Sequence, residues 1–153
     1  MIWIGIVLFV IAIDQASKII VANNINYTQK IEVIEHFFYL THVTNSGAAW
    51  GMFKNGRIFI LPLTVIMSLV IIYILSKTDS GIQKVALSLI LGGALGNLID
   101  RFFRNGYVID FLEFHFGSFV FPVFNVADSF IVIGTVLLSY CILFSKEKNL
   151  FVL

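Results

Sequence analysis

The sequence predicts an all-α membrane protein with four transmembrane helices and a small β-rich extracytoplasmic platform. Its 153 residues are 59% hydrophobic and 12% charged, with a mean hydropathy of +0.96. A soluble domain carries roughly 25% charged residues, so this chain has too few to cover a water-facing surface. With a formal net charge of +1, the composition excludes a soluble globule, a disordered chain and a nucleic-acid-binding protein.

Four stretches have the length and composition of membrane-spanning helices. A helix needs about 20 mostly apolar residues to cross the hydrocarbon core of a bilayer. The qualifying stretches run from Met1 to about Ala22, from about Ile58 to Ser76, from about Val85 to Phe103, and from about Val126 to Phe144. The length suits one domain that covers residues 1–153.

The first stretch also resembles a signal peptide in its position. A cleavable signal peptide has a basic segment before its apolar core and a small-residue cleavage motif after it. Neither feature is clear here, and apolar residues continue beyond Asp14 to Ala22. We therefore expect this stretch to remain as a spanning helix.

Four spans place both termini on the same side of the membrane. Basic residues next to short loops favour the cytoplasmic side. The short turn after the second span has Lys77 and Lys84, and the tail has Lys146 and Lys148. Although the long connections also contain basic residues, we expect cytoplasmic termini and two long extracytoplasmic connections.

The two long connections carry strand patterns. The segments Lys30–Leu40 and Val108–Phe114 mix apolar, aromatic and charged residues in a largely alternating order. Such alternation is typical of half-buried strands. We expect a small sheet that rests on the membrane surface.

Polar residues inside or beside the predicted spans need a reason. A charge at the centre of a bilayer costs about 2.5–3.5 kcal/mol on insertion scales, so such residues are candidates for function. In the expected topology these groups gather toward the outer side, and they are Asp14, Lys18, Asn97, Asp100, Arg101, Asp110, Asn125 and Asp128.

Several of these residues also have a structural interpretation. Asp14 and Lys18 are four residues apart, the spacing of an ion pair on one helix face. Asn97 and Asp100 share a helix face and are also suited to a structural polar latch. Asn125 is suited to cap the fourth helix, but a cap at Asn125 leaves Asp128 unexplained.

The glycines at positions 92, 93 and 96 of the third span have a structural interpretation of their own. Gly92 and Gly96 form a G-x-x-x-G pattern. In membrane helices this pattern is typical of a face where two backbones pack closely.

Carboxylates are the reactive groups that remain after other chemistries are considered. The chain has no G-x-S-x-G motif and no spaced zinc ligands, and its one cysteine, Cys141, lies deep in the fourth span. Two carboxylates in a poorly solvated site share one proton. Such a pair can activate water against an amide, because one group takes a proton from water while the other protonates the carbonyl oxygen.

Three aspartates are available for such a pair. Asp100 is followed by Arg101, a cation that would hold it ionised, whereas Asp110 and Asp128 have apolar neighbours in the sequence. The residues alone therefore favour Asp110 with Asp128. They leave the choice open, because proximity in sequence is not proximity in space.

Five motifs, in this order along the chain, make the sequence similar to the bacterial lipoprotein signal peptidases, or signal peptidase II, over essentially its whole length. The motifs are Asp14-Gln15-Ala16-Ser17-Lys18, Thr44-Asn45-Ser46-Gly47-Ala48-Ala49-Trp50-Gly51, Gly92-Gly93-Ala94-Leu95-Gly96-Asn97-Leu98-Ile99-Asp100-Arg101, Val108-Ile109-Asp110-Phe111 and Phe124-Asn125-Val126-Ala127-Asp128-Ser129.

The resemblance implies an intramembrane aspartic endopeptidase of the bacterial inner or cytoplasmic membrane. Such an enzyme removes the signal peptide from diacylglyceryl-modified prolipoproteins by cutting before the lipidated cysteine. The implied partners are these precursors, membrane lipid and the peptide antibiotic globomycin. No metal and no organic cofactor are expected.

The resemblance also assigns site residues and places the active site toward the outer face. The catalytic aspartates of the family correspond to Asp110 and Asp128. The positions that shape or support the site correspond to Asp14, Asn45, Asn97, Asp100, Arg101, Asn125 and Ala127.

Two other functions fit clustered membrane carboxylates. A small proton or ion carrier would use them as a relay, but a relay strings its acids across the full bilayer, and here they gather on one side. A non-catalytic helical scaffold would tolerate conservative changes at both Asp110 and Asp128.

Overall fold

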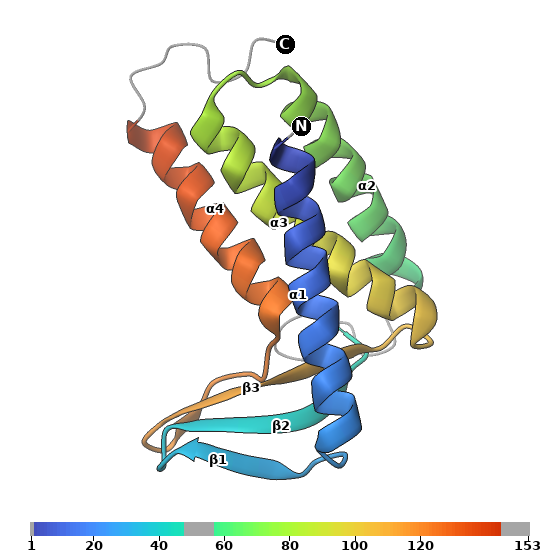
Figure 1. The fold of residues 1–153 in the computed structure, drawn as a ribbon, viewed down its shortest axis with the longest axis vertical. Helices are drawn as coiled ribbons and strands as arrows, with labels where there is room; N and C mark the ends of the chain where they lie inside the picture. Colours follow the sequence, from blue (N-terminus) through green and yellow to red (C-terminus); the bar gives the residue numbers. More distant parts are fainter. Residues whose placement is uncertain (1, 48–56, 145–153) are drawn as a thin grey trace.

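The computed structural model describes residues 2–47 and 57–144, and within these ranges the chain forms four helices and one four-stranded sheet (Figure 1). All four helices are long and apolar enough to cross a membrane. The predicted fold class is therefore confirmed. The helices are α1 (Ile2–Asn24), α2 (Arg57–Lys77), α3 (Gly81–Phe103) and α4 (Val126–Phe144).

Helix α3 is the centre of the bundle and packs against each of the other three helices. Half of the most apolar stretch of α3 is buried. For α2, which lies at the periphery, the corresponding share is 6%. A Cβ atom at Gly93 would lie 2.4 Å from the Ala127 carbonyl oxygen, and one at Gly96 would lie 2.6 Å from Asp14 Oδ2. These glycines let α3 approach α1 and α4 closely, so the close-packing interpretation is confirmed.

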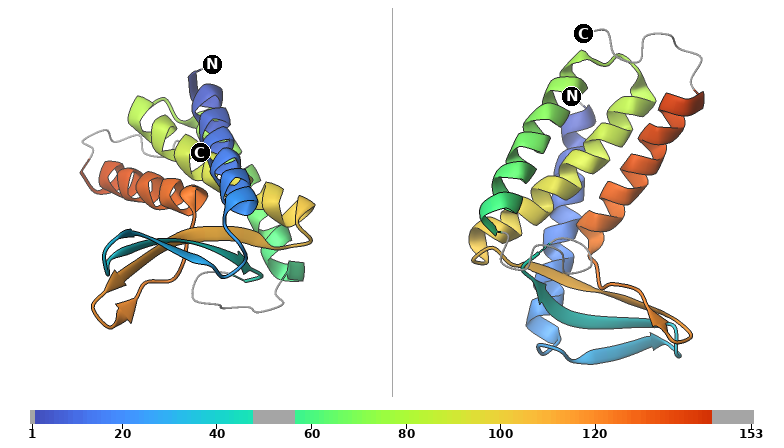
Figure 2. Two further views of the ribbon diagram at one scale, coloured as in Figure 1. Left: turned by 60° about the horizontal axis from the view of Figure 1, so that its bottom comes forward. Right: turned by 180° about the vertical axis from the view of Figure 1, so that it is seen from behind.

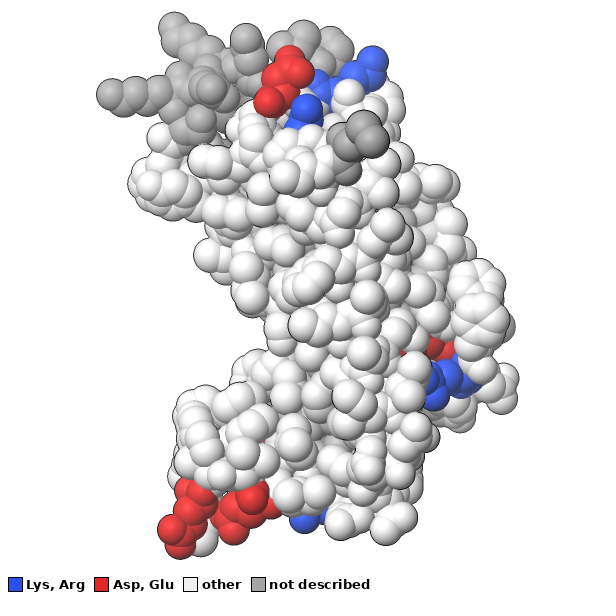
Figure 3. Space-filling model, in the orientation of Figure 1, with Lys and Arg blue, Asp and Glu red and all other residues white. Residues whose placement is uncertain are grey.

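The outer surface of the bundle is apolar. Large side chains such as Leu8, Leu69 and Val136 are more than half exposed, as expected for helices that face lipid. Figure 3 shows a broad uncharged band over the helices, with charged side chains above and below it. Lys146 and Lys148, which supported cytoplasmic termini in the sequence, lie outside the described residues.

The strand-like connections form the expected sheet. Its strands are antiparallel in the order β1 (Lys30–Ile34), β2 (Phe38–Asn45), β3 (Val108–Phe116) and β4 (Phe119–Val120). The pattern over Lys30–Leu40 proves to span two strands and a turn. His36 has a positive φ of 54°, and the Phe37 N–H donates to the Ile34 carbonyl oxygen (3.0 Å).

The sheet lies at the end of the bundle where α1 ends and α4 begins (Figures 1 and 2). Val21 and Ile25 near the end of α1 pack against Ile109 and Phe111 of β3. This apolar contact fixes the sheet beneath the helices. It also sets β3 beside the polar residues of α1, α3 and α4.

Candidate active site

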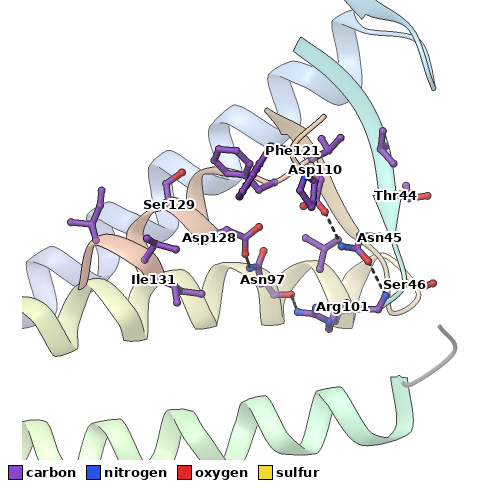
Figure 4. A pocket seen from close by; sticks show the side chains of 18 residues that line it. Thr44, Asn45, Ser46, Asn97, Arg101, Asp110, Phe121, Asp128, Ser129 and Ile131 are labelled. Carbon is purple, nitrogen blue, oxygen red and sulfur yellow. Dashed lines mark hydrogen bonds between the residues drawn. The ribbon is translucent and has the colours of Figure 1, made fainter. Parts of the chain in front are cut away.

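A cavity of about 860 Å³ lies where the sheet meets the helices (Figure 4). Its polar lining includes side chains from the end of β2, the start of β3, α3 and α4. Its apolar lining comes mainly from residues 121–124 and from Ile131, Val132 and Ile133 of α4. In the motif that begins at Thr44, residues 48–51 lie outside the described part of the chain.

Asp110 of β3 and Asp128 of α4 both line this cavity, and amide groups hold both carboxylates. Asn125 Nδ2 donates to Asp110 Oδ1 (2.6 Å), and Asn45 Nδ2 donates to Asp110 Oδ2 (3.0 Å). Asn97 Nδ2 donates to Asp128 Oδ1 (2.8 Å). The two aspartates are thus held in one network, from β2, β3, α3 and the start of α4.

Asp110 holds a proton near neutral pH. Its pKa is raised to about 7, because burial and the neighbouring charge of Asp128 outweigh the hydrogen bonds from Asn45 and Asn125, which lower it. Asp110 is only 3% exposed. A buried carboxylic acid with a pKa in this range is suited to give and take a proton at physiological pH.

Asp128 belongs to the cap of α4. Asn125 Oδ1 accepts the Asp128 N–H (3.0 Å), and Asp128 Oδ2 accepts the Asn125 N–H (3.2 Å). This reciprocal pattern is a capping box. The capping interpretation of Asn125 is confirmed, and it accounts for Asp128 as well. The free N–H groups of the first helical turn stabilise a negative charge at this position.

A second group of carboxylates lies behind the cavity and is held by cations. The fully buried Lys18 Nζ lies 2.9 Å from Asp14 Oδ2 and 3.0 Å from Asp100 Oδ2. Arg104 Nε lies 3.2 Å from Asp100 Oδ1. The predicted pair of Asp14 with Lys18 is confirmed, and the common face of Asn97 and Asp100 is turned toward Lys18.

The adjacent Arg101 is not the cation that binds Asp100. Its guanidinium donates to the Asn97 carbonyl oxygen (3.4 Å) and the Gly47 carbonyl oxygen (3.3 Å). Arg101 therefore connects α3 to the chain just after β2, and it lines the cavity (Figure 4).

Asp14 fixes the position of α4 relative to α1. Asp14 Oδ1 accepts the Ala127 N–H (3.0 Å), one of the free donors of the first turn of α4. Ala127 is fully buried, and a Cβ atom at Gly96 would lie 3.5 Å from the Cβ atom of Ala127. Small residues are needed at both positions because α1, α3 and α4 meet there.

The structure brings all nine predicted site residues into one region. Those that line the cavity are Asn45, Asn97, Arg101, Asp110 and Asp128, and those behind it are Asp14, Asp100, Asn125 and Ala127. The carboxylates of Asp14, Asp100 and Asp128 are joined through Lys18 and Asn97. The acids of a proton relay would instead follow a path across the bundle. In the described ranges, no group of three or more His, Cys, Asp or Glu side chains is placed to hold a metal ion.

Two residues have roles that the sequence analysis did not assign. Gln15 Nε2 lies 3.1 Å from each of Asp14 Oδ2, the Gly96 carbonyl oxygen and Asp100 Oδ1. Lys18 contacts Asn97 in addition to the two carboxylates. The spacing of Asp14 and Lys18 indicated their pairing, but nothing in the sequence indicated contacts between positions 79 and 85 residues apart.

Comparison with known proteins gives consistent matches. Residues 6–144 match the family model described as signal peptidase (SPase) II. The chain is 47% identical over 143 residues to a lipoprotein signal peptidase of Caldanaerobacter subterraneus subsp. tengcongensis, covering 92% of this chain and 95% of that protein.

Two solved structures share the fold. Both are described as bacterial membrane enzymes, determined by the in meso method at 2.3 and 1.9 Å resolution. The first has a TM-score of 0.84 and 37% identity, and it covers 95% of this chain and 92% of its own. The second has a TM-score of 0.82 and 35% identity, with 94% of each chain covered.

Proposed function

The chain belongs to the signal peptidase II family, and on that basis we propose that it removes the signal peptides of prolipoproteins by aspartic-peptidase chemistry at Asp110 and Asp128. Its four apolar helices make it a multi-pass protein of a bacterial membrane. One observation carries the assignment of the pair. The two carboxylates face one cavity and are held by amides, and one of them keeps its proton to about pH 7.

The geometry supports a division of labour between the two acids. In this division, Asp128 takes a proton from a water molecule, whose oxygen attacks the carbonyl carbon of the scissile amide. Asp110 donates its proton to the carbonyl oxygen, which gives a tetrahedral diol. The C–N bond then breaks as Asp128 passes its proton to the leaving nitrogen, and Asp110 recovers a proton from the diol.

The apolar part of the cavity supports a lipid-modified substrate. Ile131, Val132 and Ile133 lie one turn beyond Asp128, and Val132 and Ile133 are more than half exposed on the outside of the bundle. An acyl chain can therefore reach the acids directly from the bilayer. We assign the substrate as a diacylglyceryl-modified prolipoprotein that is cut before the modified cysteine, and globomycin as an inhibitor that occupies the same cavity.

The positions of the charges support a site that faces the outer side. The site and the sheet lie at the end of the bundle opposite the turn between α2 and α3 (Figure 1), which is flanked by Lys77 and Lys84. Basic residues at a short turn favour the cytoplasmic side. We therefore place both termini in the cytoplasm and the site near the extracytoplasmic boundary.

Cleavage by the purified full-length chain in detergent micelles tests the proposed function. We expect a diacylglyceryl-modified precursor to be cut before the modified cysteine, the same precursor without lipid to stay intact, and globomycin to stop the reaction. Mass spectrometry of the two products identifies the bond. An intact modified precursor, or a cut at another bond, would contradict the proposal.

A further inference from the structure

Lys18 uses all the hydrogen-bond donors of its ammonium group. Two of its contacts are the carboxylates of Asp14 (2.9 Å) and Asp100 (3.0 Å), and the third is Asn97 Oδ1 (2.9 Å). A lysine ammonium has three donors, and this side chain is fully buried. Neutralising two acids accounts for only two of these contacts, so the contact with Asn97 needs its own explanation.

The contact with Lys18 determines which way the Asn97 amide faces. Asn97 Oδ1 accepts from Lys18 Nζ and from Asn125 Nδ2 (3.1 Å), and Asn97 Nδ2 donates to Asp128 Oδ1 (2.8 Å). An amide turned by 180° would place its NH2 group against two other donors and its oxygen against a carboxylate. Since only the observed orientation satisfies all three neighbours, the donor must face Asp128.

We propose that Lys18 is a positioning residue for the peptidase reaction, acting through Asn97. By holding Asn97 Oδ1, Lys18 directs the amide N–H to Asp128 and fixes the carboxylate that receives a proton from water. This inference rests on the proposed function, because it concerns one of the two proposed catalytic acids. The charged groups around this chain of contacts are Asp14, Asp100, Arg101, Arg104, Asp110 and Asp128.

A double-mutant cycle separates positioning from simple charge neutralisation. Lys18→Met, Asn97→Ala and the double variant are purified as full-length chains, and kcat and KM are measured with the lipid-modified precursor. We expect each single change to lower kcat by roughly 10- to 100-fold, in the range of coupling between contacting residues, with KM within about twofold. The double variant should be no slower than Asn97→Ala by more than about threefold. Losses that multiply would overturn the inference.

Arg104→Met is the matched control. Arg104 binds the same Asp100 carboxylate as Lys18, through its Nε atom (3.2 Å), whereas it is Lys18 that contacts Asn97. Its effect on kcat should multiply with that of Asn97→Ala. If Arg104→Met shows the same loss of effect in the Asn97→Ala background, Lys18 acts through charge alone and the inference is wrong.

A second background covers the case in which Lys18→Met does not fold. When Asp14→Asn is combined with Lys18→Met, one buried anion is removed together with the buried cation. The asparagine at position 14 keeps an oxygen that can accept the Ala127 N–H. Asp100 then retains Arg104 as its cation. The cycle in this background should show the same coupling between positions 18 and 97, and multiplying losses there would again overturn the inference.

Asp110→Asn and Asp128→Asn in the same assay distinguish the two failures. Activity in either variant contradicts the proposed function. Inactivity of both, combined with independent effects of Lys18→Met and Asn97→Ala, contradicts only the positioning role of Lys18.

Discussion

Two groups of carboxylates lie side by side in the fold, and they differ in what surrounds them. Asp14 and Asp100 are bound by the cations Lys18 and Arg104. In the described part of the chain, the hydrogen bonds to the side chains of Asp110 and Asp128 come from asparagine amides and one backbone N–H. Residues of one type, on touching elements, are therefore paired with cations in one group and hydrogen-bonded mainly by amides in the other.

The difference follows from the energetics of buried charge. A buried ion is strongly destabilising unless an opposite charge and hydrogen bonds satisfy it. Two cations bind the two carboxylates of the first group, so its buried charges are paired. Amides donate hydrogen bonds without supplying a full charge, so the second group lowers its energy by keeping one proton. The first group is suited to structure and the second to chemistry.

The largest expected effect is on catalysis in the amide-held group. Asp110→Asn and Asp128→Asn should each lower kcat by at least about 10³-fold, because each removes a proton-transfer group, and cleavage of the lipid-modified precursor measures this. Asp79→Asn is the control, since Asp79 is an exposed acid in the turn between α2 and α3. A wild-type rate in Asp110→Asn or Asp128→Asn would mean that the two groups do not differ in the way described.

The next largest effect is on stability in the cation-held group. Asp100→Asn leaves Lys18 and Arg104 with one fewer anion, and breaking a buried ion pair costs about 3–5 kcal/mol. We expect a lower free energy of unfolding in detergent, while the folded fraction keeps far more activity than Asp110→Asn. If Asp100→Asn is as stable as the wild type but inactive, Asp100 belongs to the chemistry and the pairing of Asp110 with Asp128 is wrong.

A third effect links stability to pH. The pKa of Asp110 is raised from 3.8 to about 7 in the folded chain, so between these values the folded state binds a proton that the unfolded state has lost. Wild-type stability must therefore fall as pH rises, by about 2–3 kcal/mol between pH 5 and 8. Asp110→Asn lacks this dependence.

Unfolding of both proteins at pH 5 and pH 8 measures the difference. Relative to the wild type, the unfolding free energy of Asp110→Asn should be more favourable at pH 8 than at pH 5. Parallel pH dependences of Asp110→Asn and the wild type would show that Asp110 is ionised throughout this range.

The helices could be predicted from the sequence because the length of an apolar stretch is a strong signal. The four predicted spans agree with α1 to α4 within four residues, and the largest difference is at the start of α3. Gly81 and Lys84 belong to its first turn, where the Lys84 N–H donates to the Ser80 carbonyl oxygen (3.0 Å). Hydropathy misses such residues because they are polar and yet helical. The turn at His36 was missed because the residues on both sides of it have strand patterns.

The candidate site could be predicted as a set of residues, but its division into two groups could not. The cations of Asp100 come from Lys18, in another helix, and Arg104, one turn further along. Sequence adjacency instead suggested Arg101. In the same way, Glu113 of β3 is buried between Lys30 and His115, and the sheet register that brings Lys30 there cannot be read from the two segments separately. Contacts between distant elements decide which acids are neutralised.

The smallest expected effect concerns one amide of the second group. Asn45 lies at the end of β2, opposite Val108 of β3, and its Nδ2 donates to Asp110 Oδ2 (3.0 Å). This donor lowers the pKa of Asp110, so Asn45→Ala should raise that pKa above about 7. In the proposed mechanism Asp110 must be protonated, so the rate of cleavage falls as pH rises through its pKa. The alkaline limb of the pH–rate profile should therefore move to higher pH by roughly half to one unit.

Thr44→Ala is the matched control for Asn45→Ala. Thr44 also lines the cavity, but its hydroxyl is hydrogen-bonded to the Tyr27 hydroxyl (3.0 Å) rather than to an aspartate, so the position of its alkaline limb should stay unchanged. A shift of the Asn45→Ala profile to lower pH would mean that the limb reports a different group, because losing a donor to a carboxylate can only favour its protonated form. The direction of this small shift therefore tests whether an amide-held aspartic acid supplies the proton in catalysis.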